Sequence, residues 1–470
     1  MNEALRTLLP IAGWTEERCR ALEITGASDP ILPTPFRITE AVTAALTAVG
    51  LAVSDLWELR TGRRQQVALD TRRATASLRG NHYMKLDGVA VPTDRTAMTG
   101  AYPAKNGRWS YLHCNFPTHR AAALKVLGVS EDREAVGKAV AQWDALHLEE
   151  AIIAAHGAGG MVRSMAEWAR HPQGIAIAAL PLMEIIRIGD SPPQRFRDGD
   201  RPLSGIRVLD LTRVLAGPTC ARTLAEHGAD VLKISGAHVP NVSYPEYDTG
   251  HGKLSAYLDL REAQDAETLR RLIREADVFS QGYRPGAIGR HGFAPEALVK
   301  LRPGLVVISM CAFSHTGPWA ARRGFDTVVQ TVSGMSSRQG EVLPGARPGP
   351  QFYPVSAIDV LTGYLMAFGA LVALVRRARL GGSWLVRISL AQVGRWLVER
   401  GQVPGAALKD VPKEFSPAEI ERWSMTSDTP FGRLQHLAPV LRLSETPPRW
   451  ARPTVPLGYH QPAWPSNRVA

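Results

Sequence analysis

The stretch that decides the fold is Ser204–Ser235, SGIRVLDLTRVLAGPTCARTLAEHGADVLKIS. Its pattern predicts a short apolar strand over Ile206–Leu211, a turn of small residues, a helix, and a second strand over Asp230–Ile234. Two further strands are predicted in ADVFSQGY (276–283) and LVVISMCAF (305–313), each behind a helical segment. Strands that alternate with helices predict a doubly wound parallel α/β sheet, whose ligands bind beyond the carboxyl ends of the strands.

The rest of the chain is organised around this Rossmann-like sheet. The segment DSPPQRFRDGDRP is rich in proline and charge and lacks an apolar period, so it predicts a linker. The predicted units are a helix and strand over residues 1–79, a smaller α+β domain over 80–190, the linker over 191–202, the large α/β domain over 203–395, and a C-terminal segment over 396–470.

An internal repeat relates distant parts of the chain. Residues 40–69 overlay residues 359–388 without a gap, at an offset of about 319 residues. A second echo relates EIIRIGDSPPQRF (184–196) to PVLRLSETPPRW (439–450). We therefore expect two unequal copies of one unit: the first lacks the parallel sheet, and the second has only a short stretch where the first has its α+β domain. The identical pairs include Gly50 with Gly369 and Val67 with Val386.

The repeat pairs two acids, Glu40 and Asp359, each at the start of a long apolar segment. We expect Asp359 to precede the first turn of a helix, where backbone N–H groups lack partners and the helix dipole favours an anion. As an ordinary N-cap, this carboxylate needs no other role. The same position would keep it ionised and fixed, as a nucleophile requires, so capping and catalysis are compatible.

Two turns after predicted strands suggest ligand contacts. Ala216–Pro218 are small residues at a strand-to-helix turn, which suits a phosphate or a thioester carbonyl. Tyr283, Arg284 and Arg290 surround a Pro-Gly turn, and an aromatic ring with guanidinium groups suits adenine and phosphates. A surface turn with solvated arginines explains the same spacing. The sequence has neither GxGxxG nor a P-loop motif, so a nicotinamide or ATP site is not predicted.

The net charge of +11 raises the question of nucleic-acid binding. The arginines come as separate pairs, such as Arg72-Arg73, Arg322-Arg323 and Arg376-Arg377, without a basic run or interleaved aromatic residues. We interpret them as solvated surface that attracts small anionic ligands, and we predict no nucleic-acid partner.

Cysteine usage and hydropathy suggest the compartment. The four cysteines are scattered without a CxxC or a nearby histidine pair, so neither disulfides nor a metal site are predicted, and Cys311 with His315 lacks an ordering third group. The first residues, MNEALRTLLPIAGWTEERCR, do not resemble a signal peptide. The longest apolar stretch, Val360–Val375, is shorter than the roughly 20 residues that a bilayer needs. We expect a cytoplasmic protein without a membrane partner.

Taken in order, several segments resemble the class III CoA-transferases, the family of formyl-CoA and carnitine CoA-transferases and of α-methylacyl-CoA racemase. They include PLSGIRVLDLTRVLAGP (202–218), ADVFSQGYRPGAIGRHGF (276–293) and AIDVLTGYLMAFGALVAL (357–374). The resemblance runs in family order over about 202–390. Residues before 202 are similar to the family's later half, including its small domain in NGRWSYLHCNFPTHRAAALKVLG (106–128).

The resemblance implies a covalent mechanism. Asp359 matches the nucleophile that attacks an acyl-CoA to give a mixed anhydride, then carries CoA as an aspartyl-CoA thioester and passes it to a second carboxylic acid. It implies a CoA-binding large domain, a CoA thioester as substrate and no permanently bound cofactor. The residues predicted at CoA are Val214, Leu215, Ala216, Lys253, Arg261, Tyr283, Arg284, Arg290 and Phe325.

Two alternatives stay open at this point. The family's racemases use a histidine where this chain has Phe325, so proton exchange by an acyl-CoA racemase or isomerase would lack one base, and CoA transfer is favoured. Ser235 and Gly282 depart from the family pattern on the phosphate side, which leaves open a non-catalytic CoA-binding member.

The repeat also bears on assembly, because members of the family are interlocked dimers. It predicts either a homodimer or a monomer folded as a pseudo-dimer. In the second case the first copy supplies the small domain that the second copy lost, and Glu40 marks a relic site.

Overall fold

The computed structural model describes residues 2–92, 96–196, 198–242 and 244–465. Its central layer is a 7-stranded sheet in the order β11-β10-β9-β12-β13-β14-β8, in which only β8, at one edge, runs antiparallel to its neighbour. The predicted α/β fold with a doubly wound parallel sheet is confirmed. The strands are β8 (Glu184–Gly189), β9 (Arg207–Leu211), β10 (Asp230–Ser235), β11 (Lys253–Tyr257), β12 (Val278–Gln281), β13 (Val306–Cys311) and β14 (Ser383–Ser389).

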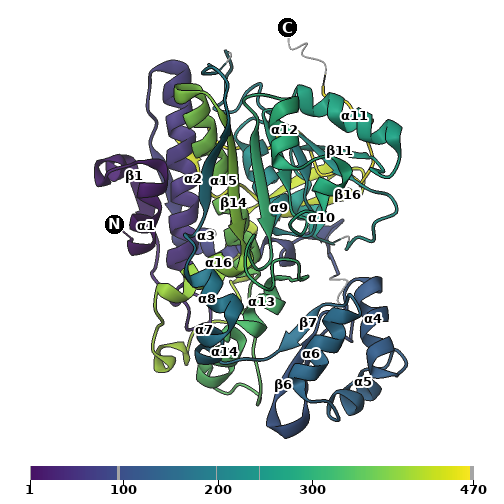
Figure 1. The fold of residues 1–470 in the computed structure, drawn as a ribbon. Helices are drawn as coiled ribbons and strands as arrows, with labels where there is room; N and C mark the ends of the chain where they lie inside the picture. Colours follow the sequence, from purple (N-terminus) through teal and green to yellow (C-terminus); the bar gives the residue numbers. More distant parts are fainter. Residues whose placement is uncertain (1, 93–95, 197, 243, 466–470) are drawn as a thin grey trace.

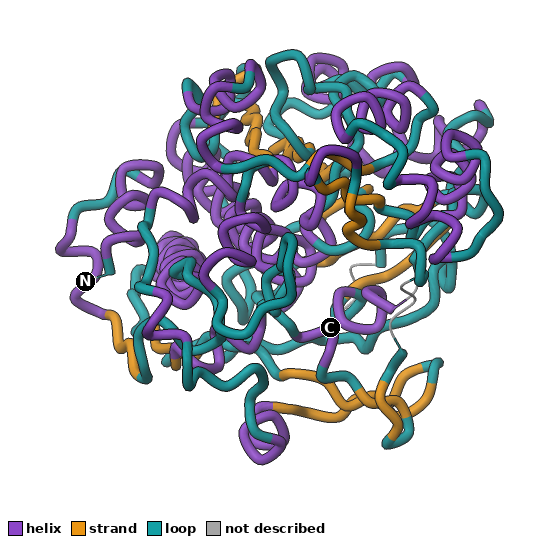
Figure 2. The backbone as a smooth tube through the Cα atoms, turned by 90° about the horizontal axis from the view of Figure 1, so that it is seen from below, coloured by secondary structure: helices purple, strands orange, loops and turns teal. Residues whose placement is uncertain are grey.

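Helices cover both faces of this sheet, because alternate strand residues point to opposite sides. Val208 of β9 joins the core formed with α9 (Ala216–Glu226) and α15 (Ala357–Leu380). The next residue, Leu209, joins a second core with α11 (Ala263–Arg274) and α12 (Pro295–Leu301). Figures 1 and 2 show helices on both sides of the strands.

Two long helices, α2 (Ile38–Thr61) and α15, pack against each other in the interior. Both are long and apolar enough to cross a membrane by length and composition alone, but 89% and 94% of their most apolar windows are buried inside the protein. Two helices that pack in a protein core are buried in this way. The length and hydropathy of α2 and α15 are therefore only weak evidence for a membrane span.

The segments that repeat in sequence have the same local architecture. β2 (Val67–Asp70) pairs parallel with β1 (Leu22–Thr25) and antiparallel with β17 (Arg442–Leu443), just as β14 pairs parallel with β13 and antiparallel with β8. Apart from β8, every described strand of the 7-stranded sheet follows residue 202, so the first copy does not carry that α/β sheet. It retains a 3-stranded sheet, because the apolar faces of a helix and a strand must be covered by a further layer.

One contact between a helix glycine and a strand valine occurs in both segments of the repeat. A Cβ added to Gly50 would lie 2.5 Å from Cγ1 of Val67, and a Cβ added to Gly369 would lie 2.7 Å from Cγ1 of Val386. These are the two residue pairs that the sequence repeat aligns. Glycine is needed at both positions because each helix crosses its own strand closely.

The two halves of the chain exchange edge strands. β8 precedes the linker yet pairs with β14, whereas β17 lies near the C-terminus yet pairs with β2. These strands lie in the two segments of the second sequence echo. The halves are therefore interlocked within one chain.

A small lobe projects from the main body, at the lower right of Figure 1. Its core is an antiparallel sheet covered by helices. A separate 4-stranded sheet joins residues of the predicted small domain to the C-terminal segment. The lobe consists of β5 (Gly100–Pro103), β6 (Trp109–Leu112), β7 (Gly159–Met161), α4 (Pro117–Leu127), α5 (Arg133–Val140) and α6 (Ala145–Ala154), and the separate sheet of β3 (Lys85–Leu86), β4 (Val89–Ala90), β15 (Ser424–Thr429) and β16 (Gly432–Leu437).

The remaining α-helices connect these layers. They are α1 (Glu3–Ala12), α3 (Thr71–Ser77), α7 (Met165–Arg170), α8 (Pro172–Ala178), α10 (Tyr244–Thr249), α13 (Asp326–Val332), α14 (Met335–Val342), α16 (Leu390–Glu399) and α17 (Pro417–Trp423).

Candidate active site

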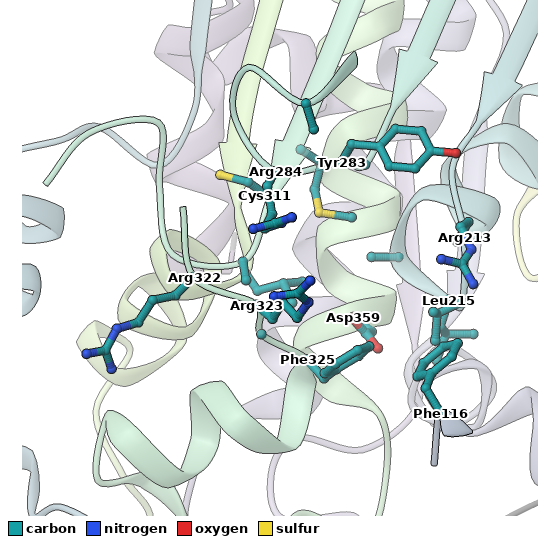
Figure 3. A pocket seen from close by; sticks show the side chains of 18 of the residues that line it. Phe116, Arg213, Leu215, Tyr283, Arg284, Cys311, Arg322, Arg323, Phe325 and Asp359 are labelled. Carbon is teal, nitrogen blue, oxygen red and sulfur yellow. The ribbon is translucent and has the colours of Figure 1, made fainter. Parts of the chain in front are cut away.

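A cavity of about 390 Å³ lies at the carboxyl ends of the central strands, where a parallel sheet binds its ligands. Leu211 and Cys311, the last residues of β9 and β13, line it. Phe116 and His119 of the small lobe line it as well. Because Asp359 is also in the lining, we call it the Asp359 cavity. Figure 3 shows the Asp359 carboxylate beside the ring of Phe325.

Asp359 is the third residue of α15, and the expectation that it precedes the helix as an N-cap is wrong. The N-cap is Ser356, whose side chain makes no capping hydrogen bond. Instead the carboxylate of Asp326, at the start of α13, accepts a hydrogen bond of 3.0 Å from the backbone N–H of Asp359. Capping is thus done by another segment, and the half-buried side chain of Asp359 faces the cavity.

The electrostatics at Asp359 also differ from the expectation of an ionised carboxylate. Burial raises the pKa of Asp359 well above its ordinary value, and the negative charge of Asp326 raises it further. The helix dipole does not outweigh these two effects. Both effects favour the protonated form of the Asp359 carboxyl group.

Glu40 has the same position in α2 but different surroundings. The carboxylate of Asp29 accepts hydrogen bonds from the backbone N–H groups of Thr39 (3.0 Å) and Glu40 (2.8 Å), as Asp326 does for Asp359. The Glu40 side chain accepts a hydrogen bond of 3.0 Å from the backbone N–H of Ala4 in α1. The backbone of α1 therefore binds the Glu40 carboxylate. The carboxyl group of Asp359, at the aligned position, faces a cavity instead.

The Asp359 cavity is strongly cationic. Arg213, Arg284, Arg322 and Arg323 line it, and Asp359 is the one carboxylate among the described residues of its lining. Arg322 pairs with Glu149 at 3.0 Å. Burial and the positive charge of Arg284 lower the pKa of Arg323, so a bound anion would stabilise this arginine pair.

The interpretation of Arg322 and Arg323 as solvated surface is wrong. Both are half-buried, because the loop before α13 folds back over the carboxyl edge of the sheet. In the view of Figure 3, Arg323 and Arg213 lie on opposite sides of Asp359.

Three residues predicted at CoA, Val214, Leu215 and Ala216, come together in the cavity wall. α9 begins at Ala216 without a side-chain cap. Val214 has a φ of 68°, a left-handed conformation that is strained for a β-branched residue. Such strain is maintained at sites where the backbone must approach a ligand.

The other predicted CoA residues divide into two groups. Phe325, Tyr283 and Arg284 line the Asp359 cavity. Tyr283 also lines an adjoining cavity of about 260 Å³, the outer cavity, together with Arg261. Nε of Arg261 donates to Oδ1 of Asp259 at 2.9 Å.

Lys253 and Arg290 are not brought to these cavities. Nζ of Lys253 is buried and donates to Oδ2 of Asp210 (2.8 Å) and to the carbonyl oxygen of Pro218 (2.9 Å). It therefore supports the turn between β9 and α9 from within. Arg290 is exposed in the short turn Ile288–His291 and is in the lining of neither cavity.

Cys311 and His315 do lie together, with 3.7 Å between Sγ and Nδ1. Burial raises the pKa of the Cys311 thiol to about 12 and lowers the pKa of His315 to about 4. Both groups are neutral at pH 7, so this pair has no thiolate for nucleophilic attack.

A third cavity of about 260 Å³, the small-lobe cavity, lies on the other side of Asp359. Asp359, Asp326 and Phe325 line it with aromatic residues such as Tyr111 and Tyr353. The hydroxyl of Tyr353 is buried and has no hydrogen-bond partner in the part of the chain that the structure describes. Asp359 thus lines two cavities, one cationic and one with several aromatic residues in its wall.

Sequence reasoning missed several residues of the site. Asp326 was not singled out, and neither were Arg213, Phe116 and His119. The density of aromatic and histidine side chains in HCNFPTH (113–119) was a usable signal. Its position opposite Asp359 depends on a tertiary contact between the small lobe and the sheet.

Comparisons with known proteins find one family and several relatives that resemble this chain. The family described as CoA-transferase family III matches residues 203–419. An acetyl-coenzyme A transferase, nodX, of Hypoxylon pulicicidum is 31% identical over 65% of this chain and 55% of its own length. An acyl-CoA transferase of Gibberella moniliformis is 26% identical over 93% of this chain and 90% of its own length. The chain thus spans little more than half the length of the first of these relatives.

Among solved structures, a CAIB/BAIF family protein from Brucella suis is 28% identical, with a TM-score of 0.38 over 50% of this chain and 65% of that chain. The family match begins just before β9 and extends beyond α15, so it contains most of the central sheet and Asp359. Residues 203–419 of this chain are thus similar to CoA-transferase family III.

Proposed function

We propose that this chain is an enzyme that transfers CoA between two carboxylic acids, with Asp359 as the nucleophile. The observation that carries the proposal is the half-buried Asp359 carboxyl, which lines both the cationic Asp359 cavity and the small-lobe cavity. The family match over residues 203–419 and the names of the relatives support the reaction class.

The proposed reaction proceeds through two anhydrides. The Asp359 carboxylate attacks the carbonyl carbon of an acyl-CoA, the C–S bond breaks, and CoA thiolate leaves. The thiolate attacks the Asp359 carbonyl, which releases the first acid as its carboxylate and leaves an aspartyl-CoA thioester. The second acid attacks this thioester and displaces the thiolate, which then takes the new acyl group. Each difficult exchange is divided into easier steps, and no proton is gained or lost overall.

Different cavity residues would contact the two ends of CoA. Arg284 and Arg323 would hold an anionic group, because they are cations that line the same cavity and act on each other electrostatically. The loop from Val214 to Ala216 would approach the thioester with its backbone. Tyr283 and Arg261 would line the path of the nucleotide end in the outer cavity. CoA thioester is the substrate in this proposal, with no resident cofactor.

The experiment that tests the proposal traps the intermediate. The protein is incubated with a panel of acyl-CoA donors, hydroxylamine is added, and peptides are analysed by mass spectrometry. Hydroxylamine converts an anhydride or thioester on Asp359 into a hydroxamate. The absence of this adduct with every donor, together with bound CoA, would favour the non-catalytic alternative.

A specific observation keeps a second candidate, acyl-CoA racemase or isomerase. His113 stacks on Phe325 with ring centroids 3.8 Å apart, and His119 lies edge-on to the same ring at 5.6 Å. The small lobe therefore places two histidines beside Phe325, whose own side chain has no basic group. Wash-in of solvent deuterium at the α-carbon of an acyl-CoA would support this alternative.

The exchange of edge strands supports a pseudo-dimeric monomer as the working unit. The first half supplies the small lobe, the second half supplies Asp359, and both line the same cavity. In this proposal the site needs no second copy of the chain, although the sequence alone left a homodimer open.

Asp326→Asn should shift the acid limb of kcat/KM for CoA transfer toward lower pH. The charge of Asp326 raises the pKa of Asp359, and an asparagine removes that charge while its amide oxygen still accepts from the Asp359 N–H. The pH dependence of kcat/KM in the wild type and the variant measures this shift. An unchanged limb in a folded variant would show that Asp359 does not set it.

Glu40→Gln should leave CoA transfer unchanged. Its carboxylate accepts from the backbone of α1, and it is absent from the described lining of the three cavities. The amide retains an acceptor, so we expect a loss of unfolding free energy of about 1 kcal/mol or less. Steady-state rates and a denaturation curve check both expectations, and a tenfold loss of rate would mean that the first copy keeps a catalytic role.

A further inference from the structure

The N-cap and first turn of α4 carry an aromatic cluster. The rings of Phe116 and His119 lie 5.4 Å apart, and both contact Phe325, each at 5.6 Å between centroids. The guanidinium of Arg213 lies 5.4 Å from the centre of the Phe116 ring. His119 is therefore held at the cavity wall by contacts from both the small lobe and the large domain.

His119 is a buried polar group without a partner for one of its nitrogens. The residue is 9% exposed, and Nδ1 has no hydrogen-bond partner among the described residues. The same residue lines the Asp359 cavity. A buried ring nitrogen without a hydrogen bond reduces the stability of the folded protein. We therefore expect the His119 ring to have a function when a ligand is bound.

The ring is neutral at physiological pH. Burial lowers the pKa of His119 to about 4, and the positive charges of Arg323 and Arg213 act in the same direction. A neutral imidazole has one N–H donor and one bare nitrogen. The bare nitrogen suits a dry position such as that of Nδ1, which leaves the single N–H on Nε2.

The proposed reaction needs a donor rather than a base at this point. CoA transfer replaces one carboxylate by another and moves no proton overall, but each attack creates negative charge on a carbonyl oxygen. A neutral imidazole N–H can stabilise such an oxyanion without losing its proton. Proton exchange at an α-carbon, by contrast, needs a base.

We propose that His119 is a further catalytic residue, which donates a hydrogen bond from its ring N–H to the acyl oxygen of the substrate bound against Asp359. This inference rests on the proposed CoA transfer and deepens it. The first half of the chain then contributes a reacting-site group to a nucleophile in the second half. The ligand chemistry is that of a thioester or anhydride carbonyl.

The test compares two substitutions at His119 with a matched control. His119→Ala removes the donor and should lower kcat for CoA transfer by about 10²- to 10³-fold. His119→Gln keeps an N–H near the position of Nε2 and should retain activity within about tenfold of the wild type. His147→Gln is the control, because His147 lies on the same lobe with a side chain that is 74% exposed. We expect no change in this variant.

The readouts separate a catalytic role from a structural one. Melting temperatures show whether each variant folds, and the pH profile of kcat should keep the same acid limb in wild type and His119→Gln. Full activity of His119→Ala, or equal loss in folded His119→Ala and His119→Gln, would overturn the donor role. If the glutamine variant loses α-deuterium exchange instead, His119 acts as a base. A wild type without the Asp359 hydroxamate would refute the underlying function rather than this inference.

Discussion

Asp359→Asn should reduce CoA transfer by at least about 10⁴-fold, the scale on which enzymes lose rate when a nucleophile is removed. Asparagine has nearly the same shape but cannot form an anhydride or a thioester by exchange with an acyl-CoA. Asp359 is half-buried and lines two cavities. The described lining of the Asp359 cavity contains no other carboxylate that could replace it. Initial rates with the best donor and acceptor measure the loss.

The same substitution should stabilise the fold at neutral pH. Burial and Asp326 raise the pKa of Asp359 above its unfolded value, so the folded state binds this proton more tightly. The resulting stabilisation is complete below the unfolded pKa and is lost as pH rises through the folded pKa. At pH 7 the wild type therefore carries a cost that asparagine removes, and the melting temperature of the variant should be higher.

Glu40→Gln is the matched control for this experiment, since it changes the equivalent position of the repeat. A variant of Asp359 that keeps more than about a hundredth of the activity would contradict the covalent mechanism. A lower melting temperature in folded Asp359→Asn would contradict the electrostatic account of the site.

The sheet could be predicted from sequence because its signals are local. Ser204–Ser235 contains a complete strand, helix and strand, and the structure places β9, α9 and β10 within it. The repeat aligns Gly50 and Val67 with Gly369 and Val386, and in the structure each glycine lies against the valine of its own segment. Both inferences depend on residues within one strand–helix unit.

Features that depend on distant contacts could not be predicted in this way. β8 becomes an edge strand of the central sheet although the linker separates it from every other strand there. From the sequence, Arg322 and Arg323 are interpreted as solvated surface, because their burial depends on how the loop before α13 folds over the sheet. Lys253 matched a ligand position, but its ammonium group is buried and bonded to Asp210. Charge type is visible in a sequence, whereas the direction of a side chain is not.

The small lobe is joined to the cavity by a buried ion network. The Glu149 carboxylate, 1% exposed, accepts from Nη1 and Nη2 of Arg163 at 2.7 and 2.9 Å. It also accepts from Nη1 of Arg322 at 3.0 Å. Because Arg322 lies beside Arg323 in the cavity wall, this network connects the lobe to the cationic side of the site.

Glu149→Gln should therefore cost about 3–5 kcal/mol of unfolding free energy, the scale for breaking a buried pair while its partner stays charged. Burial acts to raise the pKa of Glu149, but the hydrogen bond and charge of Arg163, with Arg322, outweigh it and lower the pKa overall. The stabilisation is thus present above the unfolded pKa and is lost as pH falls through the folded one. Urea denaturation at pH 7 and pH 4 should show a smaller difference between wild type and variant at the lower pH.

The activity of folded Glu149→Gln should show a raised KM for acyl-CoA with a smaller change in kcat, because Arg322 and Arg323 shift while Asp359 stays on α15. Glu150→Gln is the matched control, since Glu150 is the exposed neighbour on the same helix and should change neither quantity. If Glu149→Gln unfolds like the control at pH 7, the network contributes nothing to stability. If its kcat falls and its KM is unchanged, the lobe acts on the chemistry rather than on the binding of CoA.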